Sequence, residues 1–556
     1  MLKIQSVFLL AGLVHAGGYG AAQYTIPPTS TNASQPFDGF VSYSIEFSSF
    51  PDFAGNKSHP NTFSNNLLSN IGALIGTKPY IRVGGNTQDY ALYNASLPYA
   101  LNGTVDPKRS PDYPTTIHIG PSYFESYSTW PDVKFSHGFN LGLGGNISHP
   151  EGWQTLLDTV PLACKALGGG KWYAWEYGNE PDLFSTSAQG AVRPPSWNEK
   201  EYVQQWLNGT GKIKELLKAH CPDMVGHGQD EFLGLSFAGT SNHLRANTTF
   251  ADGINVEKDI KLFSTHNYIS GATSPGVTLQ GTLMNHTSTM RSVQNHVAEY
   301  ARILAVDPSA PPHIMGETNS LYNQGKPGLS NSFGAALWGV DFNLYCASVG
   351  IRRVHMHMGT NYRYQSWQPV TTELDSIGTK APYYGNIAVA AFLGDIPASP
   401  VSVAHIPLTE TTEAAYVAYT STKNSTGANT LARIMILNMH SYNSTVDGQG
   451  LSPLPASEVT PRGSKNYTFS LDSTLAGRKV KVSRLWANGS DAITGITWDG
   501  WSYNYELDEG RPVRLRNVTV GEATVVGKDG SVSVSVLDSS AVILDFGKGC
   551  KRRGTR

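Results

Sequence analysis

Apolar residues in the first two thirds of the chain recur in two alternating patterns, short runs and longer segments. The short runs are rich in β-branched and aromatic residues and predict buried strands, while the longer segments show the three-to-four-residue spacing of helices. Eight strands alternating with helices predict an α/β fold, a closed parallel (β/α)8 TIM barrel. The predicted strands are Val41–Phe47, Tyr80–Val83, Phe139–Leu143, Trp172–Gly178, Gly234–Phe237, Leu262–Tyr268, His313–Gly316 and Val354–Met358. The predicted helices are Asn65–Ile75, Thr155–Leu167, Tyr202–Leu217, Met290–Leu304 and Phe333–Val349.

The pattern changes after about residue 390, where helical spacing stops and short alternating segments separated by Gly, Ser, Asn and Asp begin. Such segments predict an antiparallel β-sandwich. We therefore expect a catalytic barrel over residues 36–390 and a β-sandwich domain over 391–556, with the segment 17–35 adding an edge strand at Gln23–Pro27. The strands expected in the sandwich are Ala415–Tyr419, Ala432–Asn438, Lys479–Trp486, Val513–Val518, Ser531–Val536 and Ala541–Phe546.

Residues 1–16 resemble a secretory signal peptide. Lys3 precedes the apolar run Val7–Val14, and Val14-His15-Ala16 provides a small-residue cleavage site, the arrangement of an exported precursor. No later apolar run approaches the roughly 18 residues of a membrane helix, and the basic tail Lys551–Arg556 lacks a lipid-anchor signal. These features predict a secreted, extracellular protein with no membrane partner.

Sequons and cysteines agree with export. Dense Asn-x-Ser/Thr acceptors predict a glycoprotein. Cys164, Cys221, Cys346 and Cys550 allow up to two disulfides, with three possible connectivities, and their spacing fits no metal site. The acceptor asparagines are Asn32, Asn56, Asn94, Asn102, Asn146, Asn208, Asn247, Asn285, Asn424, Asn443, Asn466, Asn488 and Asn517.

The sequence does not support nucleic-acid binding, a metal site, a serine nucleophile or dinucleotide binding. The formal net charge of −2 over 556 residues gives no electrostatic basis for a nucleic-acid partner. His355 and His357 share a strand face, yet no HExxH motif or third ligand accompanies them, so no metal is expected. Ser236 in GLSFA lacks the last glycine of a nucleophile elbow, and Gly84-Gly85 lacks the spacing of a dinucleotide loop.

Two segments each run apolar residues into a glutamate that precedes a turn. Glu180, in WYAWEYGNEPDLF, ends the fourth predicted strand, and Glu317, in HIMGETNSLY, ends the seventh. Barrel enzymes place their chemistry at this end of the strands, and two carboxyls are the minimum for hydrolysing a glycosidic bond. Two surface glutamates in loops are the alternative. The rings of Trp172, Tyr173 and Trp175 favour a carbohydrate substrate, because such rings stack on sugars.

These motifs, with SIEFSSF (Ser44–Phe50), RVGGNTQDY (Arg82–Tyr90) and GETNS, are similar to those of a large clan of retaining glycoside hydrolases. The chain resembles, over nearly all its mature length, the β-glucuronidase family that also contains heparanase, in a fungal-type secreted form. The resemblance implies that Glu180 is the acid/base, Glu317 the nucleophile, and Asn179 a hydrogen-bond partner of the sugar 2-hydroxyl. No cofactor is implied, because both steps need only carboxyls with separated pKa values.

Three further residues are expected near this pair. The resemblance places Arg82 beside Glu317, where its charge would keep the carboxyl ionised; an ordinary barrel ion pair is the alternative. Tyr268, at the end of the sixth strand, is expected either to donate to Glu317 or to be a packed core tyrosine. Glu46 shares a strand face with Ser44 and is expected to accept sugar hydroxyls, with a buried structural carboxylate as the competing account.

A glucuronide differs from a glucoside by its C5 carboxylate, so its pocket must offer hydrogen-bond donors. Arg363 follows the eighth strand and would be the simplest partner. By resemblance, the carboxylate is held instead by tyrosine hydroxyls and backbone N–H groups, and Tyr322, Tyr364 and Gly325 match those positions. The alternative is that both tyrosines merely stack or cap loops.

The predicted function is retaining hydrolysis of β-linked glucuronic acid, with or without a 4-O-methyl group, from glycans or glycoconjugates. One alternative is a related barrel hydrolase of neutral β-glycosides, such as a xylanase or glucosidase. Another is a carbohydrate-binding protein without catalysis, against which both glutamates and their neighbours are present. Sequence patterns distinguish neither terminal from internal cleavage nor one oligomeric state from another.

Overall fold

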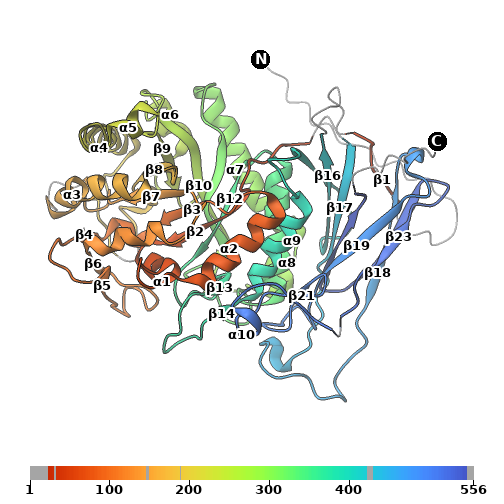
Figure 1. Cartoon of the computed structure of the whole chain (residues 1–556). Helices are drawn as coiled ribbons and strands as arrows, with labels where there is room; N and C mark the ends of the chain where they lie inside the picture. Colours follow the sequence, from red (N-terminus) through yellow and green to blue (C-terminus); the bar gives the residue numbers. More distant parts are fainter. Residues whose placement is uncertain are drawn as a thin grey trace, which may run out of the picture.

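A ring of eight parallel strands and a β-domain beside it make up the described chain (Figure 1). The computed structural model describes residues 23–29, 33–145, 150–187, 190–421, 430–516 and 518–547. The predicted signal peptide, the basic tail, Cys550 and the sequons at Asn32, Asn146, Asn424 and Asn517 lie outside these residues. In the described part of the chain, no helix is long and apolar enough to cross a membrane.

The predicted barrel is confirmed, and it closes where its last strand pairs in parallel with its first. Most barrel strands are buried along their whole length, as expected when helices cover the outside and side chains fill the inside. The strands, in order around the barrel, are β2 (Val41–Glu46), β3 (Ile81–Gly84), β7 (Phe135–Phe139), β8 (Trp172–Tyr177), β9 (Phe232–Phe237), β10 (Ile260–Gly271), β11 (His313–Tyr322) and β12 (Val354–Met358).

The third strand was predicted at Phe139–Leu143, which is wrong, since β7 ends at Phe139. Beyond it, the N–H groups of Leu141 and Gly142 donate to the Asp89 carboxylate at 2.7 and 2.9 Å instead of to a neighbouring strand. Leu141 is buried like a strand residue, which explains the error. These backbone N–H groups therefore bond to a side chain distant in the sequence rather than to the backbone of a neighbouring strand.

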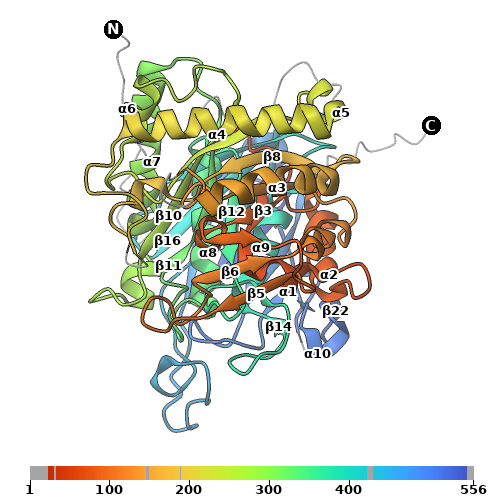
Figure 2. The ribbon, with the colours of Figure 1, turned by 90° about the vertical axis from the view of Figure 1, so that its left-hand side faces the viewer.

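Helices cover the barrel, and four of the longer ones are capped by polar side chains. Asn61, Asn198, Asn285 and Ser332 each accept a backbone N–H at a helix start. Figure 2 shows α4 crossing the barrel on the side away from the β-domain, outside β8. The longer helices are α2 (Thr62–Ile75), α3 (Pro150–Leu167), α4 (Glu199–His220), α7 (His286–Val306), α8 (Phe333–Ser348) and α9 (Ala381–Leu393), with shorter α1 (Phe50–Ala54), α5 (Pro222–Gly226), α6 (Ala246–Ala251) and α10 (Tyr505–Asp508).

Helix α9 was not predicted, and it extends the barrel beyond the expected boundary at residue 390. Helices α8 and α9 lie between the barrel and the β-domain (Figure 1) and are buried on nearly every side. A helix covered all round lacks the alternation of apolar and polar residues that reveals a surface helix. Its sequence, APYYGNIAVAAFL, therefore shows no clear helical period.

An insertion between β3 and β7 forms a small sheet of its own, in the order β4-β6-β5. Its strands are β4 (Ala91–Tyr93), β5 (Leu101–Thr104) and β6 (Thr116–Ile119). A 3-10 helix, η3 (Pro121–Ser128), leads back toward β7. The insertion carries Asp112 and Tyr113 to the loop after β12, where they contact Arg363 and Tyr362.

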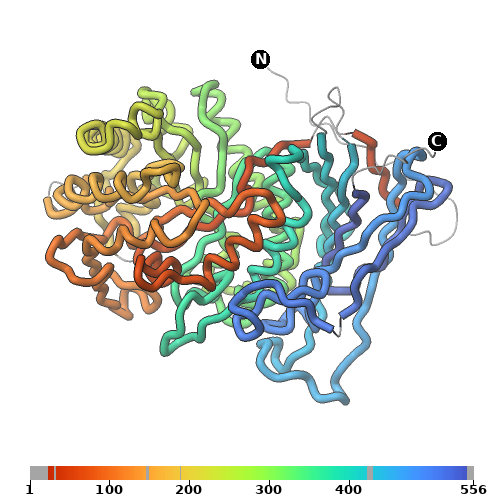
Figure 3. The backbone as a smooth tube through the Cα atoms, viewed as in Figure 1, coloured from red at the N-terminus to blue at the C-terminus, as the bar shows by residue number. Residues whose placement is uncertain are grey.

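The β-domain has two sheets that share a core containing Val417, Ile434, Phe469, Val534 and Leu544. Strand β1 pairs in parallel with β18, so residues 23–25 add a strand to the β-domain; Figure 3 shows this red segment beside the blue C-terminal strands. The smaller sheet contains β1 (Gln23–Thr25), β18 (Ser464–Ser470) and β24 (Ser531–Leu537). The larger contains β15 (Val401–Ile406), β16 (Glu413–Thr420), β17 (Thr430–Asn438), β19 (Lys479–Trp486), β20 (Thr497–Trp498), β21 (Trp501–Ser502), β22 (Val513–Arg514), β23 (Ala523–Val525) and β25 (Ser540–Asp545).

One disulfide, Cys164–Cys221, joins α3 to the end of α4. Cys346 is buried in α8 without a disulfide, so of the two disulfides that four cysteines would allow, the described residues contain one. The sequon residues Asn56, Asn94, Asn102, Asn208, Asn443, Asn466 and Asn488 are exposed.

Candidate active site

Glu180 and Glu317 lie together at the carboxyl ends of the barrel strands, where they line a cavity of about 570 Å³. Glu180 follows β8, and Glu317 lies within β11. Loops from several strands complete the wall, so residues far apart in the sequence meet there. Other lining residues used below are Glu46, Asn179, Tyr268, Tyr322, His357 and Tyr364.

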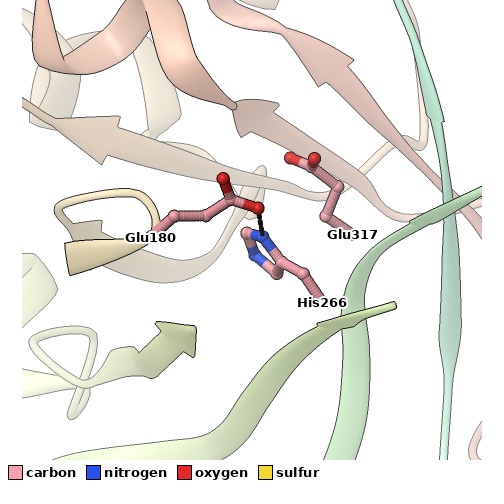
Figure 4. Close-up of side chains that lie close together, drawn as sticks. All are labelled: Glu180, His266 and Glu317. Atoms are coloured by element: carbon pink, nitrogen blue, oxygen red, sulfur yellow. Dashed lines mark hydrogen bonds and ion pairs between the residues drawn. The ribbon is translucent and has the colours of Figure 1, made fainter. Parts of the chain in front are cut away.

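The backbone of Glu180 is left-handed, with φ 51° and ψ 49°. A non-glycine residue in this region costs of order 1–3 kcal/mol and persists where the surroundings impose it. Here the N–H of Glu180 donates to the carbonyl of Ser236 at 2.9 Å, and Pro181 begins a 3-10 turn. The side chain reaches His266, whose Nδ1 lies 2.9 Å from Oε1 of Glu180 (Figure 4).

Each oxygen of Glu317 has a separate donor. Nη1 of Arg82 donates to Oε2 at 2.6 Å, and the hydroxyl of Tyr268 donates to Oε1 at 2.8 Å. His357 lies farther away, with Nδ1 3.5 Å from Oε2. The expected contacts of Arg82 and Tyr268 with Glu317 are therefore present. Hydrogen bonds of this kind stabilise the ionised carboxylate.

The two carboxyl groups are close. Oxygen atoms of Glu180 and Glu317 and a ring nitrogen of His266 all lie within 4.8 Å of one another (Figure 4). Retaining glycosidases separate their carboxyls by roughly 5–5.5 Å, whereas inverting enzymes leave roughly 6.5–9.5 Å for a water molecule. The spacing matches direct attack by one carboxylate.

The surroundings drive the two carboxyl pKa values apart. Burial raises the pKa of Glu180, and the negative charge of Glu317 raises it further. Burial alone would also raise the pKa of Glu317, but positive charge around it outweighs this effect and lowers the pKa below its usual range. Proteins assign acid and nucleophile roles to two carboxyls by this kind of separation.

Two histidines near the pair differ in charge. Burial lowers the pKa of His266 to about 4, so its ring is neutral in mildly acid solution. Burial also disfavours the cation of His357, but the carboxylates of Glu317 and Glu46 outweigh it and raise that pKa. A charged His266 would also lower the pKa of Glu317, but His266 is neutral in mildly acid solution. The positive charge beside Glu317 at that pH therefore comes from His357 and Arg82.

Glu180, His266 and Glu317 present three atoms that could in principle hold a cation. The guanidinium of Arg82, which is fully buried, already bonds Glu317 and also donates to Glu176 at 2.9 Å. A second cation beside it would be repelled. The cluster therefore fits an acid and a nucleophile better than a metal centre.

Glu46 and Asn179 line the cavity, but most of their polar atoms already form hydrogen bonds within the protein. Oε1 of Glu46 accepts from the N–H and hydroxyl of Thr87, and Oε2 accepts from the hydroxyl of Tyr362 at 3.2 Å. This pattern favours the structural account of Glu46. Asn179 accepts from Nη2 of Arg82 at 2.8 Å and donates to Asn86 at 3.0 Å, so its amide is held rigidly at the cavity wall.

The expected carboxylate-binding residues occupy different places. Tyr364 is buried in the cavity wall, with its hydroxyl 3.5 Å from that of Tyr268. Tyr322 is 47% exposed at the rim. The N–H of Gly325 donates to the carbonyl of Leu321 at 3.1 Å and is not free for a ligand, so its predicted role needs correction. Its φ of 81° shapes the loop instead.

Arg363 does not face the cavity as a free cation. It forms a two-pronged ion pair with Asp112 of the insertion, with Nη2 2.8 Å from Oδ2. Its Nε also donates to the carbonyl of Gly325 at 3.3 Å. It therefore ties the loop after β12 both to the insertion and to the loop after β11.

The prediction that the β8 aromatic residues stack on sugars is wrong. Trp175 is fully buried and donates to the carbonyl of Gln229 at 3.0 Å. Trp172 and Tyr173 begin β8 and lie at the opposite end of the barrel, where Nζ of Lys261 is 4.3 Å from the Trp172 ring centre. A strand spans the barrel, so only its last residues reach the site.

Several site residues were not predicted, above all His266 and Glu176. His266 precedes Tyr268 by two residues on β10, and the period of two in a strand points both side chains into the barrel. That spacing could have identified it. Glu176, which accepts from Arg82 and from the hydroxyl of Ser236, resembles any buried strand residue in sequence and gave no comparable signal.

Known proteins resemble this chain over most of its length. Residues 415–543 match the glycosyl hydrolase family 79 C-terminal beta domain. A β-glucuronidase of Neurospora crassa is 62% identical over 562 residues, covering 95% of this chain and 99% of that protein. A β-glucuronidase of Aspergillus niger is 55% identical over 514 residues, covering 91% and 90%.

The fold also recurs in a solved structure. The crystal structure of a 4-O-α-L-rhamnosyl-β-D-glucuronidase from Fusarium oxysporum matches with a TM-score of 0.72 at 23% identity, covering 94% of this chain and 100% of that one. At this identity the likeness concerns the fold alone.

A closed (β/α)8 barrel with two adjacent carboxyls, one following its fourth strand and one within its seventh, defines a glycoside hydrolase. The chain belongs to the β-glucuronidases of glycosyl hydrolase family 79. The resemblance inferred from the motifs is thereby confirmed.

Proposed function

We propose that this enzyme removes β-linked glucuronic acid with retention of configuration, using Glu180 as acid/base and Glu317 as nucleophile. The observation that carries the proposal is the close approach of two carboxyls, within 4.8 Å, whose pKa values are driven in opposite directions. Identities of 62% and 55% with proteins named β-glucuronidase support the choice of sugar.

In the first step, protonated Glu180 donates its proton to the glycosidic oxygen while a carboxylate oxygen of Glu317 attacks the anomeric carbon. The bond to the leaving group breaks, an ester bond to Glu317 forms, and the leaving group departs as an alcohol. Arg82 and Tyr268 hold the Glu317 carboxylate in place for the attack.

In the second step, the Glu180 carboxylate takes a proton from water, and the water oxygen attacks the anomeric carbon. The ester bond breaks, Glu317 is regenerated, and the sugar leaves with its original β configuration. Two inversions at one carbon therefore explain retention.

Tyr364 and Tyr322 are proposed to bind the sugar carboxylate. Tyr364 is a buried donor in the cavity wall, and Tyr322 lies at its rim. Neutral donors suit a partly buried anion, because hydrogen bonds to charged groups contribute about 1.5–3 kcal/mol.

Initial rates on aryl β-glucuronides and aryl β-glucosides test the substrate assignment. We expect the glucuronide to be strongly preferred and the first-formed product to be the β-anomer by NMR. Preference for the neutral glycoside would instead support a glucosidase or xylanase, and lack of turnover on both would support a binding protein.

We further propose that the protein is secreted and glycosylated. The apolar N-terminus with its cleavage site, the exposed sequons and the Cys164–Cys221 disulfide support this location. N-terminal sequencing of protein from the culture medium should begin shortly after Ala16, and endoglycosidase treatment should lower its apparent mass. Retention of the native protein inside the cell would contradict the proposal.

A further inference from the structure

A second cavity, of about 390 Å³, lies beside the catalytic one. It is bounded by the end of β10, the loop after β9 and the first half of α7. Ala238, Gly239 and Tyr268 line both cavities, so the two meet along a common rim. Nothing in the proposed catalytic steps uses this second space.

Three buried polar atoms beside this cavity have no hydrogen-bond partner in the described part of the chain. They are Nε2 of His266, Nδ2 of Asn267 and Nδ1 of His296, and the three residues are 0%, 6% and 3% exposed. All three residues line the cavity. Since buried polar groups are nearly always paired, such a concentration beside one cavity indicates a polar occupant.

The hydrogen bonds around Asn267 define what that occupant must offer. Its Oδ1 accepts from the hydroxyl of Ser292 at 2.8 Å and contacts Nε2 of His296 at 3.1 Å. His296 must therefore carry its proton on Nε2, and burial lowers its pKa to about 4, so its Nδ1 is a free acceptor. The amide of Asn267 is a free donor. Hydroxyl groups both donate and accept, so they offer a partner to each of these atoms.

The charged side chains around the cavity indicate which kind of ligand it can hold. No acidic side chain is among its described lining residues, and Arg291 on α7 lines it without a hydrogen bond or ion pair in the described ranges. Thr282 and Ser288 add hydroxyls to the wall. A donor-rich cavity with one unpaired cation suits an acceptor-rich, uncharged or acidic ligand and disfavours a cationic one.

We propose that this second cavity binds a hydroxyl-rich saccharide unit of the leaving group, next to the sugar that is cleaved. The assignment rests on the proposed roles of Glu180 and Glu317. Glu180 protonates the leaving oxygen, and His266 contacts Glu180 through Nδ1 while lining the second cavity. Through His266, the second cavity adjoins the carboxyl that protonates the leaving group in the proposed mechanism.

The test compares two substrates of the intact enzyme. An aryl β-glucuronide has no sugar to place in the second cavity, whereas a disaccharide of glucuronic acid β-linked to a neutral hexose does. Arg291→Ala should raise KM for the disaccharide roughly ten- to hundredfold and change KM for the aryl glucuronide by less than about twofold. Arg302→Ala, an exposed arginine of the same helix that does not line the cavity, is the matched control and should change neither.

A second variant blocks the space instead of removing a donor. Asn295 is exposed and lines the cavity, so Asn295→Trp should fold and should impair the disaccharide selectively. Equal losses on both substrates, or unchanged KM for the disaccharide in both variants, would overturn the proposal and leave a water-filled cavity. Failure of the wild-type enzyme to cleave the aryl glucuronide would instead reject the proposed function itself.

Discussion

His266 within β10 and Glu180 after β8 are in direct contact, with Nδ1 of the ring 2.9 Å from Oε1 of the carboxyl. The ring is neutral in mildly acid solution because burial lowers its pKa to about 4. A neutral imidazole can accept a hydrogen bond from protonated Glu180 and, as the other tautomer, donate to the ionised form. The contact therefore suits both protonation states that the proposed mechanism requires of Glu180.

The pH dependence of kcat/KM follows from the two carboxyls. In the proposed mechanism the active form has Glu317 ionised and Glu180 protonated, so the rate should fall below the pKa of Glu317 and above that of Glu180. The first pKa is lowered and the second is raised, which gives a broad optimum in mildly acid solution. A rate that stays flat to about pH 9 would contradict a carboxylic acid as proton donor.

Glu317→Gln should lower the pKa of Glu180, because the negative charge of Glu317 is one cause of its elevation. The shift is measurable by NMR titration of the labelled Glu180 carboxyl in the inactive variant. Burial remains in the variant, so the pKa should stay above the usual value of about 4.3. An unchanged or higher pKa would show that the two groups do not interact as described.

Glu317→Ala should reduce turnover by at least about 10³-fold, since it removes the carboxylate proposed to form the covalent intermediate. Azide should restore activity by occupying the freed space, and the product should be the inverted α-glycosyl azide. Glu180→Ala should retain slow turnover only on substrates whose leaving group needs no proton. Near-normal activity of Glu317→Ala on natural glycosides would exclude it as nucleophile.

Tyr364→Phe should cost roughly ten- to hundredfold in kcat/KM on glucuronides and spare any weak glucosidase activity. Tyr322→Phe should act in the same direction but less strongly, because its side chain is 47% exposed and its donor competes with water. The measurement is the ratio of efficiencies on paired aryl substrates. Equal losses on glucuronide and glucoside would show that neither hydroxyl recognises the carboxylate.

Asp112→Asn and Arg363→Lys should each lower kcat/KM on glucuronides roughly ten- to hundredfold by displacing the loop that carries Tyr364. The double variant should lose little more than either single one, because both remove one ion pair. If Arg363 bound the substrate carboxylate directly, Asp112→Asn would leave it available, and the two single variants would diverge. The Asp112–Arg363 cycle therefore separates positioning from direct binding.

A buried pair of the barrel helices α7 and α8, next to β15 of the β-domain, is expected to make stability depend on pH. Nδ1 of His286 lies 2.9 Å from Oδ1 of Asp341, and Nε2 lies 2.9 Å from Nε2 of His405 on β15. Burial opposes the charged form of His286, but Asp341 outweighs it and raises its pKa. Burial likewise opposes the charge of Asp341, but His286 outweighs it and lowers that pKa. His405 is neutral at pH 5 and above because burial lowers its pKa to about 4.

The sign of the effect follows from these shifts. The contribution of His286 is complete below its unfolded pKa of about 6.5 and is lost as pH rises through the higher folded value. That of Asp341 is complete above about 3.9 and is lost as pH falls through its lower folded value. Asp341→Asn should therefore lower the free energy of unfolding by about 3–5 kcal/mol at pH 5. Its Tm should fall much more at pH 5 than at pH 9. His440→Ala, which removes an exposed His440–Asp538 pair, should change Tm little at either pH.

Much of the fold could be predicted because its signals are local. Alternating strand and helix patterns identified the barrel, and β12 was predicted with its observed bounds. Helix α9 was missed because burial on every side removes the amphipathic signal. The end of β7 was missed because Asp89, distant in sequence, binds the backbone that follows it.

The sequence by itself determined that Glu180 and Glu317 belong to the fourth and seventh strand segments of a barrel, and hence the class of chemistry, because strand order in a closed barrel follows chain order. Only the tertiary structure decided which groups surround them. His357 and Arg82 come from two different strands, and their charges lower the pKa of Glu317, while burial and the charge of Glu317 raise that of Glu180. Such interactions depend on distances of a few ångströms between residues far apart in the chain, which no local pattern encodes.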